Sequence, residues 1–255
     1  MNLQTQKSVR IYMRVGVPLS IFIMCILLRK RVRTARRLLF AWIYSRYFAN
    51  SNAKTLAQYK RQLFSTMREI KSCDESLRGK GHIRIVEIGI GTGTNLEYYP
   101  EGCRLISVEP NSYFESLFKK NRNAFPGVVV EKFVRGSAED MSAIPSGSVD
   151  CVVSTLVLCS VDDLANSIRE VKRILVEGGH FYYIEHVGYE RGTWANTLQR
   201  LVEPFWSAVS DGCQLTRETS LQVDLIGFRA IRENLYFPEA LPYVARPILV
   251  GVAVK

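Results

Sequence analysis

The stretch from Ile83 to Tyr99, IRIVEIGIGTGTNLEYY, decides the fold. A short apolar run leads directly into three glycines at alternate positions, 89, 91 and 93, and a helical stretch follows. Glycine allows a tight turn and a close approach of the backbone to a ligand, so this segment predicts a ligand-cradling loop between a strand and a helix. A dinucleotide fold would carry GxGxxG, but Thr94 stands where the last glycine of that motif would fall.

Outward from this loop, short apolar runs alternate with helical stretches. The pattern predicts strands near 83–88, 103–109, 128–134, 149–155 and 180–186, and helices near 111–124, 162–175, 193–208 and 216–226. Such alternation indicates an α/β fold with a mostly parallel sheet covered on both faces. Two further apolar runs are joined by a loop too short for a crossover helix, so they are predicted to form an antiparallel pair, 228–235 with 248–254. The pair Gly178–Gly179 is predicted to cap the helix before strand 180–186.

The composition supports one core. The chain has 255 residues, of which 47% are hydrophobic and 23% charged, which excludes a disordered protein. Its six cysteines occur singly, without a CxxC pair, and this spacing argues against both a disulfide scaffold and a zinc ribbon. We therefore expect a reducing compartment.

The net charge of +10 is concentrated at one end. Residues 1–80 carry 17 Lys and Arg against 3 Asp and Glu, whereas the rest of the chain carries 17 against 21. A basic segment attached to a mildly acidic domain indicates a membrane surface and disfavours nucleic acid.

The first 37 residues are predicted to be a membrane anchor. The run Val15–Leu28 is uncharged and ends in a basic cluster that begins at Arg29, without a small-residue cleavage site. The cluster places the following chain on the cytosolic side. The length of the run and Pro18 suit either a short span or a bent helix that dips into the bilayer.

Residues 38–80 are predicted to form an amphipathic helical linker. Its apolar residues recur at helical spacing: Leu56, Tyr59, Leu63, Phe64, Met67 and Ile70. We expect this helix to pack on the domain as a lid, with membrane contact as the alternative. The globular domain is then expected over 81–255.

The glycine segment reads ExGxGxG from Glu87 through Gly89, Gly91 and Gly93. It resembles the first motif of class I methyltransferases that use S-adenosylmethionine, and the string from 83 to about 187 resembles the methyltransferase type 11 pattern. The resemblance implies a Rossmann-like sheet of seven strands with an antiparallel last strand. It also implies that the loop holds the methionine part of the cofactor and that Glu87 helps to hold its ammonium through bound groups.

Further cofactor contacts follow from the same resemblance. Glu109 ends the second strand, where a carboxylate accepts both ribose hydroxyls; its alternative role is a charge at the N-terminus of the next helix. In RGSAEDM, 135–141, the backbone of Ala138 and the side chain of Glu139 would meet the adenine. Thr155 and Leu156, at the end of the fourth strand, would lie beside the cofactor.

Three motifs and the N-terminal anchor extend the resemblance to nearly the whole chain. They are TLVLCSV at 155–161, EHV at 185–187 and DGCQLTRE at 211–218. Together they resemble the membrane-anchored thiol S-methyltransferases, the methyltransferase-like seven group. This resemblance implies methylation of small alkyl thiols on the cytosolic face of the endoplasmic reticulum, with some members on lipid droplets.

Methyl transfer from a sulfonium is an in-line displacement that requires alignment and exclusion of water, so no metal is expected. A thiol has a pKa near 8.5 and needs little help from a base. His186 is the histidine at the carboxyl end of a strand, and Asp211 lies in the DGC segment, so both are candidate catalytic residues. The alternative for His186 is a hydrogen-bonded structural role.

Two cysteines and a set of aromatic residues complete the candidates. Cys159 and Cys213 are interpreted as packing positions, because an activated methyl donor makes a covalent intermediate unnecessary. Trp194 and Trp206 lie in a predicted helix and would form an apolar roof over a substrate pocket, with plain core packing as the alternative.

The favoured function is methylation of small, lipophilic thiols by a membrane-anchored enzyme. One alternative is methylation of an oxygen or nitrogen of a lipophilic molecule, because this domain serves many acceptors. A second is a non-catalytic membrane or lipid-droplet scaffold that retains the cofactor-binding fold. Nucleic acid is not expected as a substrate, because the domain is net negative and carries no NPP or PC signature.

Overall fold

The computed structural model describes residue 32 and residues 34–255. The chain divides into two compact units, 1–39 and 40–255. Of the first unit, residue 32 and residues 34–39 are described, and these are helical. The predicted membrane anchor therefore falls almost entirely outside the described residues. Within the described residues, no helix combines the length and the apolar character needed to cross a bilayer.

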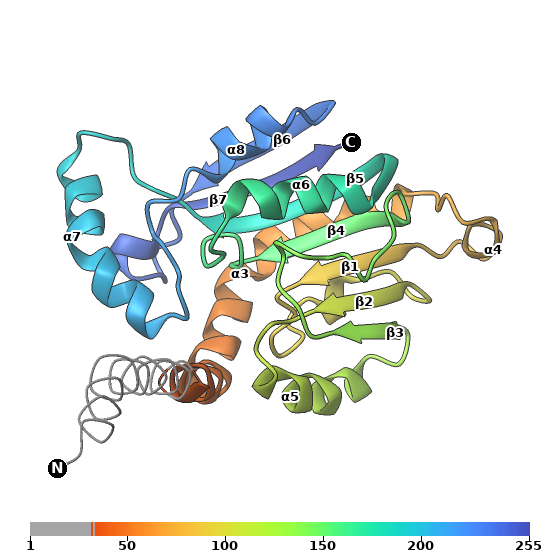
Figure 1. Ribbon diagram of the computed structural model, residues 1–255, viewed down its shortest axis with the longest axis horizontal. Helices are drawn as coiled ribbons and strands as arrows, with labels where there is room; N and C mark the ends of the chain where they lie inside the picture. The colour runs from red at the N-terminus through yellow and green to blue at the C-terminus, as the bar shows by residue number, and fades with distance from the viewer. Residues whose placement is uncertain (1–31, 33) are drawn as a thin grey trace, which may run out of the picture. The chain divides into compact units, whose positions relative to one another are not determined.

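The second unit is built on a sheet of seven strands in the order β3-β2-β1-β4-β5-β7-β6 (Figure 1). The strands are β1 (Arg84–Ile88), β2 (Arg104–Val108), β3 (Val129–Val134), β4 (Val149–Thr155), β5 (Leu175–His186), β6 (Ala230–Tyr236) and β7 (Ile248–Val254). The first five run parallel, and β7 is antiparallel to both of its neighbours, β5 and β6. The predicted sheet, including its antiparallel last strand, is confirmed.

The helices follow the predicted alternation. They are α3 (Ala49–Phe64), α4 (Glu75–Arg78), α5 (Tyr113–Asn121), α6 (Leu164–Ile174), α7 (Trp194–Val209) and α8 (Thr219–Ile226). Short turns of other helix types complete the chain: η2 (Tyr44–Phe48), η3 (Ser65–Glu69), η4 (Leu96–Tyr98), η5 (Arg122–Ala124) and η6 (Tyr243–Ala245). Three of these helices begin at side-chain caps: Asp74 accepts from the N–H groups of Ser76 and Leu77 at α4, Asp163 from that of Asn166 at α6, and Thr193 from that of Asn196 at α7.

The glycine pair before the fifth strand does not cap a helix, so that prediction is wrong. Helix α6 ends at Ile174, and Gly178 and Gly179 lie inside β5. Gly178 has φ +76°, and the pairing of β4 with β5 shifts its register beside the pair. The backbone N–H of Gly178 donates to the carbonyl of Lys255, and that of Lys255 to the carbonyl of Gly179. The two glycines thus form a bulge that joins β5 to the C-terminus.

The sheet is covered on both faces. On one face α6 and α8 bury Ile168, Val171 and Val223 against alternate residues of the strands. On the other face Phe64 and Phe118 pack on residues such as Ile85. Figure 1 shows α6 and α8 in front of the sheet and α3 behind it.

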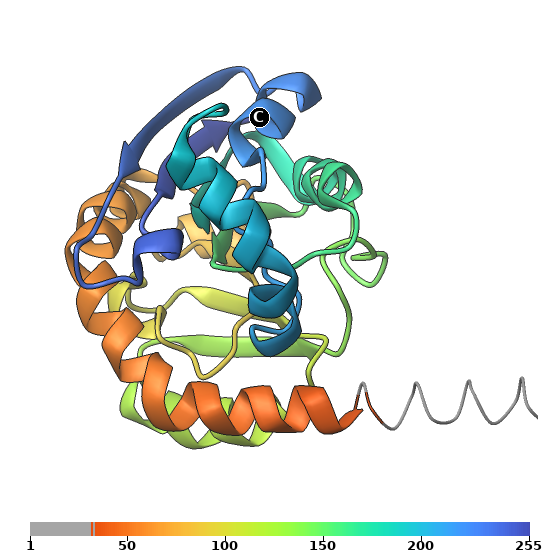
Figure 2. The same cartoon turned by 90° about the vertical axis from the view of Figure 1, so that its left-hand side faces the viewer.

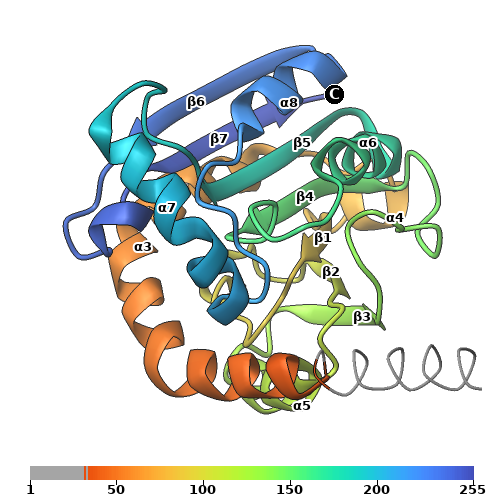
Figure 3. The same cartoon turned by 60° about the vertical axis from the view of Figure 1, so that its left-hand side comes forward.

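Helix α3 and the short turn η3 after it pack on the domain through the apolar residues that recur at helical spacing in the sequence. Leu56, Phe64 and Met67 are buried, and Tyr59 and Leu63 pack beside the cluster around β7. Helix α7 lies beyond the carboxyl ends of the parallel strands, in front of the sheet when the molecule is viewed from that end (Figures 2 and 3). The carboxyl edge of the sheet is therefore bordered by α3 on one side and by α7 on another.

Candidate active site

The glycine loop connects β1 to η4 with an open backbone. Gly89, Gly91 and Gly93 have φ of +66°, +52° and +81°, which L side chains rarely adopt. A Cβ on Gly89 would lie 2.2 Å from Cγ2 of Val157, so glycine is required there by packing. A Cβ on Gly91 would have the Gly89 carbonyl, at 3.9 Å, as its nearest neighbour. The loop is thus closed behind Gly89 and leaves open space at Gly91.

Glu87 lies buried under the loop. Its carboxylate accepts hydrogen bonds from the Tyr99 hydroxyl at 2.5 Å and from Asn95 Nδ2 at 2.8 Å. Burial is the largest cause that raises the pKa of Glu87 to about 7, against the opposing effect of these bonds and of the Lys60 ammonium. A cation above the loop would favour the ionised form of this carboxyl group.

Glu109 connects the end of β2 to the loop. Its Oε2 accepts from the backbone N–H of Gly91 at 3.0 Å, and its Oε1 from that of Asn111 at 2.8 Å. The second bond matches the alternative role at the start of the following helical segment. These bonds orient Glu109 beside the loop, and its contact with the ribose hydroxyls remains a prediction.

Asn95 offers an acceptor to a ligand. Its Nδ2 donates to Glu87 and, at 3.1 Å, to Oγ1 of Thr155, whereas its Oδ1 is buried without a hydrogen-bond partner among the described residues. A buried acceptor without a donor is costly. An ammonium group in the loop would satisfy it, so the residues present fit the methionine part of S-adenosylmethionine.

Two residues near the loop were missed by the sequence analysis. Lys60, buried on α3, donates to Oγ1 of Thr94 at 3.1 Å, and burial is the largest cause that lowers its pKa to about 8. Tyr44 stacks edge-on against Phe114, and burial, followed by the charges of Glu87 and Glu109, raises its pKa to about 12. A lysine on the apolar face of a helix was the available signal for Lys60.

The predicted adenine residues lie after β3. Ala138 is buried in the larger core cluster. The carboxylate of Glu139 accepts from the backbone N–H of Asp162 at 2.8 Å and of Asp163 at 3.4 Å. Glu139 therefore orients the segment before α6, and a contact with adenine remains a prediction.

The end of β4 is strained beside the loop. Leu156 has φ +56°, and its backbone N–H donates to the carbonyl of Ile184 at 2.7 Å. Thr155, one residue earlier, is held by Asn95. Positive φ in a leucine is unfavourable and persists only where the surrounding structure holds it, and the contact of Leu156 with the cofactor remains a prediction.

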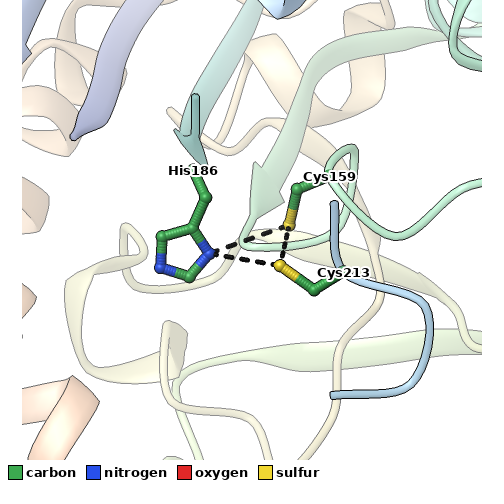
Figure 4. Close-up of side chains that lie close together, drawn as sticks. All are labelled: Cys159, His186 and Cys213. Atoms are coloured by element: carbon green, nitrogen blue, oxygen red, sulfur yellow. Dashed lines mark hydrogen bonds between the residues drawn. The ribbon is translucent and has the colours of Figure 1, made fainter. Parts of the chain in front are cut away.

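His186, at the end of β5, lies with the two cysteines interpreted as packing positions (Figure 4). Its Nδ1 is 3.5 Å from Sγ of Cys213 and 3.9 Å from Sγ of Cys159, and the two sulfurs are 3.4 Å apart. All three residues are buried. Asp211, two residues before Cys213, has φ +48°, and its carboxylate does not belong to this group.

Glu185 supports this group and was also missed. It is fully buried, accepts from the hydroxyl of Ser154 at 2.5 Å, and accepts from the backbone N–H groups of Val157 and Cys159, each at 3.2 Å. Burial raises the pKa of Glu185. Its bonds fix the turn after β4, with Val157 against Gly89 at one end and Cys159 at the other.

The two tryptophans of α7 lie in different surroundings. Trp206 packs against the small cluster that contains Cys159 and Cys213, and its buried Nε1 has no partner among the described residues. Trp194 is 69% exposed and stacks on Tyr243 at 5.3 Å. The structure thus brings Trp206, but not Trp194, to the group around His186.

The chain is similar to known methyltransferases. The family model described as a methyltransferase domain matches residues 86–183. Thiol S-methyltransferase TMT1A of Homo sapiens is 36% identical over 219 residues, 85% of this chain and 89% of that protein. TMT1B of Homo sapiens is 37% identical over 210 residues, 82% and 86% of the two chains. A solved structure of an S-adenosylmethionine-dependent methyltransferase from Thermotoga maritima, described as a possible histamine N-methyltransferase, is also similar. It superposes with a TM-score of 0.57 over 85% of this chain and 98% of its own. Its identity to this chain is 22%, so it shows the fold alone.

The sheet order and the glycine loop between buried carboxylates define a class I methyltransferase that depends on S-adenosylmethionine. Within this class, the chain belongs to the family of the thiol S-methyltransferases TMT1A and TMT1B.

Proposed function

We propose that this enzyme methylates the sulfur of small, lipophilic alkyl thiols. The observation that carries the proposal is the identity of 36% to a thiol S-methyltransferase along 85% of the chain. The ends of β5, at His186, and of β4, at Thr155, where we expect the acceptor to bind, lie within the length that the two chains share.

The chain's residues would hold the cofactor along the carboxyl ends of β1 and β2. Bound S-adenosylmethionine supplies an activated methyl group to a nucleophilic acceptor. Gly91 would leave the space for the methionine part, Asn95 Oδ1 would accept from its ammonium, and Glu109 would accept from the ribose hydroxyls. Leu156 and Val157 close the loop side and exclude water.

The acceptor side suits a thiol. Trp206 provides an apolar wall next to His186, whose imidazole can take a proton from the acceptor. A thiol with a pKa near 8.5 is partly ionised at neutral pH, so a weakly activated site suffices for it.

We propose further that the enzyme works at the cytosolic face of the endoplasmic reticulum or of a lipid droplet. The apolar run and basic flank of residues 1–37 support attachment to a membrane. Helix α7 supports it too, because one side of the helix exposes large apolar side chains: Trp194, Leu201, Phe205 and Val209. We expect lipophilic thiols that partition into the bilayer to be turned over faster than hydrophilic ones.

The test is methyl transfer from labelled S-adenosylmethionine by the membrane-embedded full chain. An alkyl thiol, the matched alcohol and the matched amine are offered separately. Transfer to the thiol alone is expected, with loss in Glu109→Ala and retention in Glu177→Ala, which removes an exposed carboxylate outside the loop. Methylation of the alcohol or the amine in place of the thiol would overturn the choice of acceptor.

A further inference from the structure

The group formed by Cys159, His186 and Cys213 has the dimensions of a metal site. Zinc bonds of about 2.3 Å to sulfur and about 2.0 Å to nitrogen place tetrahedral ligands about 3.8 Å apart for two sulfurs and about 3.5 Å for sulfur and nitrogen. The separations here are 3.4 Å between the sulfurs and 3.5 and 3.9 Å from them to Nδ1 of His186. A zinc ion fits among the three atoms with shifts of a few tenths of an ångström.

The three side chains come from separate segments that are already connected. Cys159 follows β4, His186 ends β5 and Cys213 follows α7. The backbone N–H of Gln214 donates to the carbonyl of Cys159 at 2.8 Å, and Glu185 accepts from the N–H of Cys159. These bonds hold the two cysteines in place before any ion binds, as the residues behind a metal site do.

The two turns that present the cysteines are strained. Among the described residues, the non-glycine residues with positive φ are Leu156 and Asp211, three positions before Cys159 and two before Cys213. Such strain persists where the surrounding structure requires it and concentrates at functional sites.

The group lies next to the cradle for the methyl donor. In the turn 157–159, Val157 lies against Gly89. Cys159, two residues further on, belongs to the group shown in Figure 4. Glu185 accepts from the N–H groups of both Val157 and Cys159. A metal held here would therefore lie on the acceptor side of the same active site.

We propose that Cys159, Cys213 and His186 bind a zinc ion and that the sulfur of the acceptor thiol takes its fourth position. Two sulfurs and one imidazole suit zinc, and sites with three protein ligands keep the fourth position for a substrate. The inference rests on the proposed function, since it names how a thiol is recognised and an alcohol is not. It replaces the interpretation of Cys159 and Cys213 as packing residues.

The binding step needs no oxidant or reductant. When the ion binds, Cys159 and Cys213 lose their S–H protons to water. The acceptor thiol then also loses its S–H proton to water, because His186 is here a ligand of the ion instead of the base that takes that proton. A lone pair of the acceptor sulfur binds the ion as a thiolate, because a coordinating thiol is deprotonated. In the transfer itself, the acceptor sulfur forms a bond to the methyl carbon. The bond between the donor sulfur and the methyl carbon breaks, and its electron pair stays on the donor sulfur. The neutral thioether product is a weak ligand and leaves the ion.

The test measures metal first and activity second. The full chain is purified in detergent with a reductant that does not bind metals, reconstituted with zinc, dialysed, and its metal content determined by mass spectrometry. We expect about one zinc per chain, falling at least about tenfold in Cys159→Ala, Cys213→Ala and His186→Ala. Cys103→Ala, which removes a buried cysteine elsewhere in the core, is the matched control and should keep its zinc. Binding of S-adenosylmethionine reports whether each variant is folded.

Cobalt replaces zinc to detect the acceptor. The charge-transfer absorption of the cobalt-loaded chain should increase on addition of an alkyl thiol and stay constant with the matched alcohol. Less than about a tenth of a zinc per reconstituted chain, or a Cys159–Cys213 disulfide in the freshly reduced chain, would overturn the metal site. A spectrum that the thiol leaves unchanged would overturn the open fourth position.

Activity separates this inference from the proposed function. Thiol methylation should fall at least about tenfold in the three ligand variants and stay unchanged in Cys103→Ala. Full thiol methylation by a zinc-free variant would overturn the metal's role and leave the proposed function standing. A zinc-loaded chain that methylates only alcohols or amines would overturn the proposed function while its metal content still confirms the site.

Discussion

Two alanine variants, Gly91→Ala and Gly81→Ala, should lose similar stability, and only Gly91→Ala should also lose affinity for S-adenosylmethionine. Both Gly91 and Gly81 have positive φ, +52° and +69°, and a Cβ at either position meets nothing closer than 3.9 Å. Alanine at either position therefore costs the backbone strain of a left-handed residue, about 1 kcal/mol. In a chain of this size, that corresponds to a fall in Tm of about 2–4 °C. Gly81→Ala is thus a control matched in backbone and in space.

The two variants should differ in cofactor affinity. The open space at Gly91 lies beside the backbone N–H that donates to Glu109, so the new methyl group would occupy the cradle of the methionine part. Overpacking costs about 1–3 kcal/mol, which weakens S-adenosylmethionine binding about 5- to 150-fold in Gly91→Ala. Gly91→Val should abolish measurable binding, because a β-branched residue fills more of the cradle.

Thermal unfolding and calorimetric titration with S-adenosylmethionine test these numbers on the same samples. Gly81→Ala should bind as tightly as the wild type despite its lower Tm. If Gly91→Ala bound the cofactor with unchanged affinity while showing the same fall in Tm, the loop would not be the cradle and our placement of the cofactor would be refuted.

Three further predictions concern the carboxylate under the loop, helix α3 and helix α7. Glu87 has a pKa of about 7 in the folded chain, against an ordinary value of 4.5, so the folded state binds the proton more tightly than the unfolded state does. This difference contributes about 3 kcal/mol to the free energy of unfolding. The contribution is fully present below pH 4.5 and is lost as the pH rises through 7. Glu87→Gln should flatten this part of the pH dependence measured by urea unfolding of the cofactor-free chain, and an unaltered slope would contradict the assignment. Phe64→Ala should lower the free energy of unfolding by about 3–5 kcal/mol, because the ring is buried between α3 and the sheet; a loss below about 1 kcal/mol would show that α3 does not pack as described. Trp194→Ala should change the free energy of unfolding by less than about 0.5 kcal/mol and should weaken binding to lipid vesicles, because Trp194 is exposed. Trp206→Ala should lower the turnover of thiols, because Trp206 packs beside the group around His186. Loss of thiol turnover in Trp194→Ala and loss of vesicle binding in Trp206→Ala would exchange the two roles.

The sheet could be predicted from the sequence because its signals are local. Each strand is a short apolar run, and the three glycines mark where the chain turns above β1. The error at Gly178 has a physical reason. A glycine pair after a helix is typical of a C-cap, but the C-terminal Lys255 pairs with that segment and draws it into β5. A contact over so many residues has no signal in the local sequence.

The positions of the expected cofactor residues at the strand ends were predictable for the same reason, and the side chains that contact them were not. Glu87 and Glu109 stand at the ends of strands, where the topology alone places a ligand. Lys60 reaches the loop from α3, and its role depends on how that helix packs. The buried Oδ1 of Asn95 became informative only when its Nδ2 was found to serve two other groups.

Part of the group around His186 could have been predicted from the topology of the sheet. Because β4 and β5 are neighbours in register, with Thr155 beside Ile184, residues that follow β4 must come close to the end of β5. A cysteine four residues after β4 and a histidine ending β5 are therefore expected to meet once the strand order is known. Cys213 joins them through the bond from Gln214 to the Cys159 carbonyl, which no spacing predicts. The strand order thus brings two members of this group together without any motif, and the third requires the packing of the segment after α7.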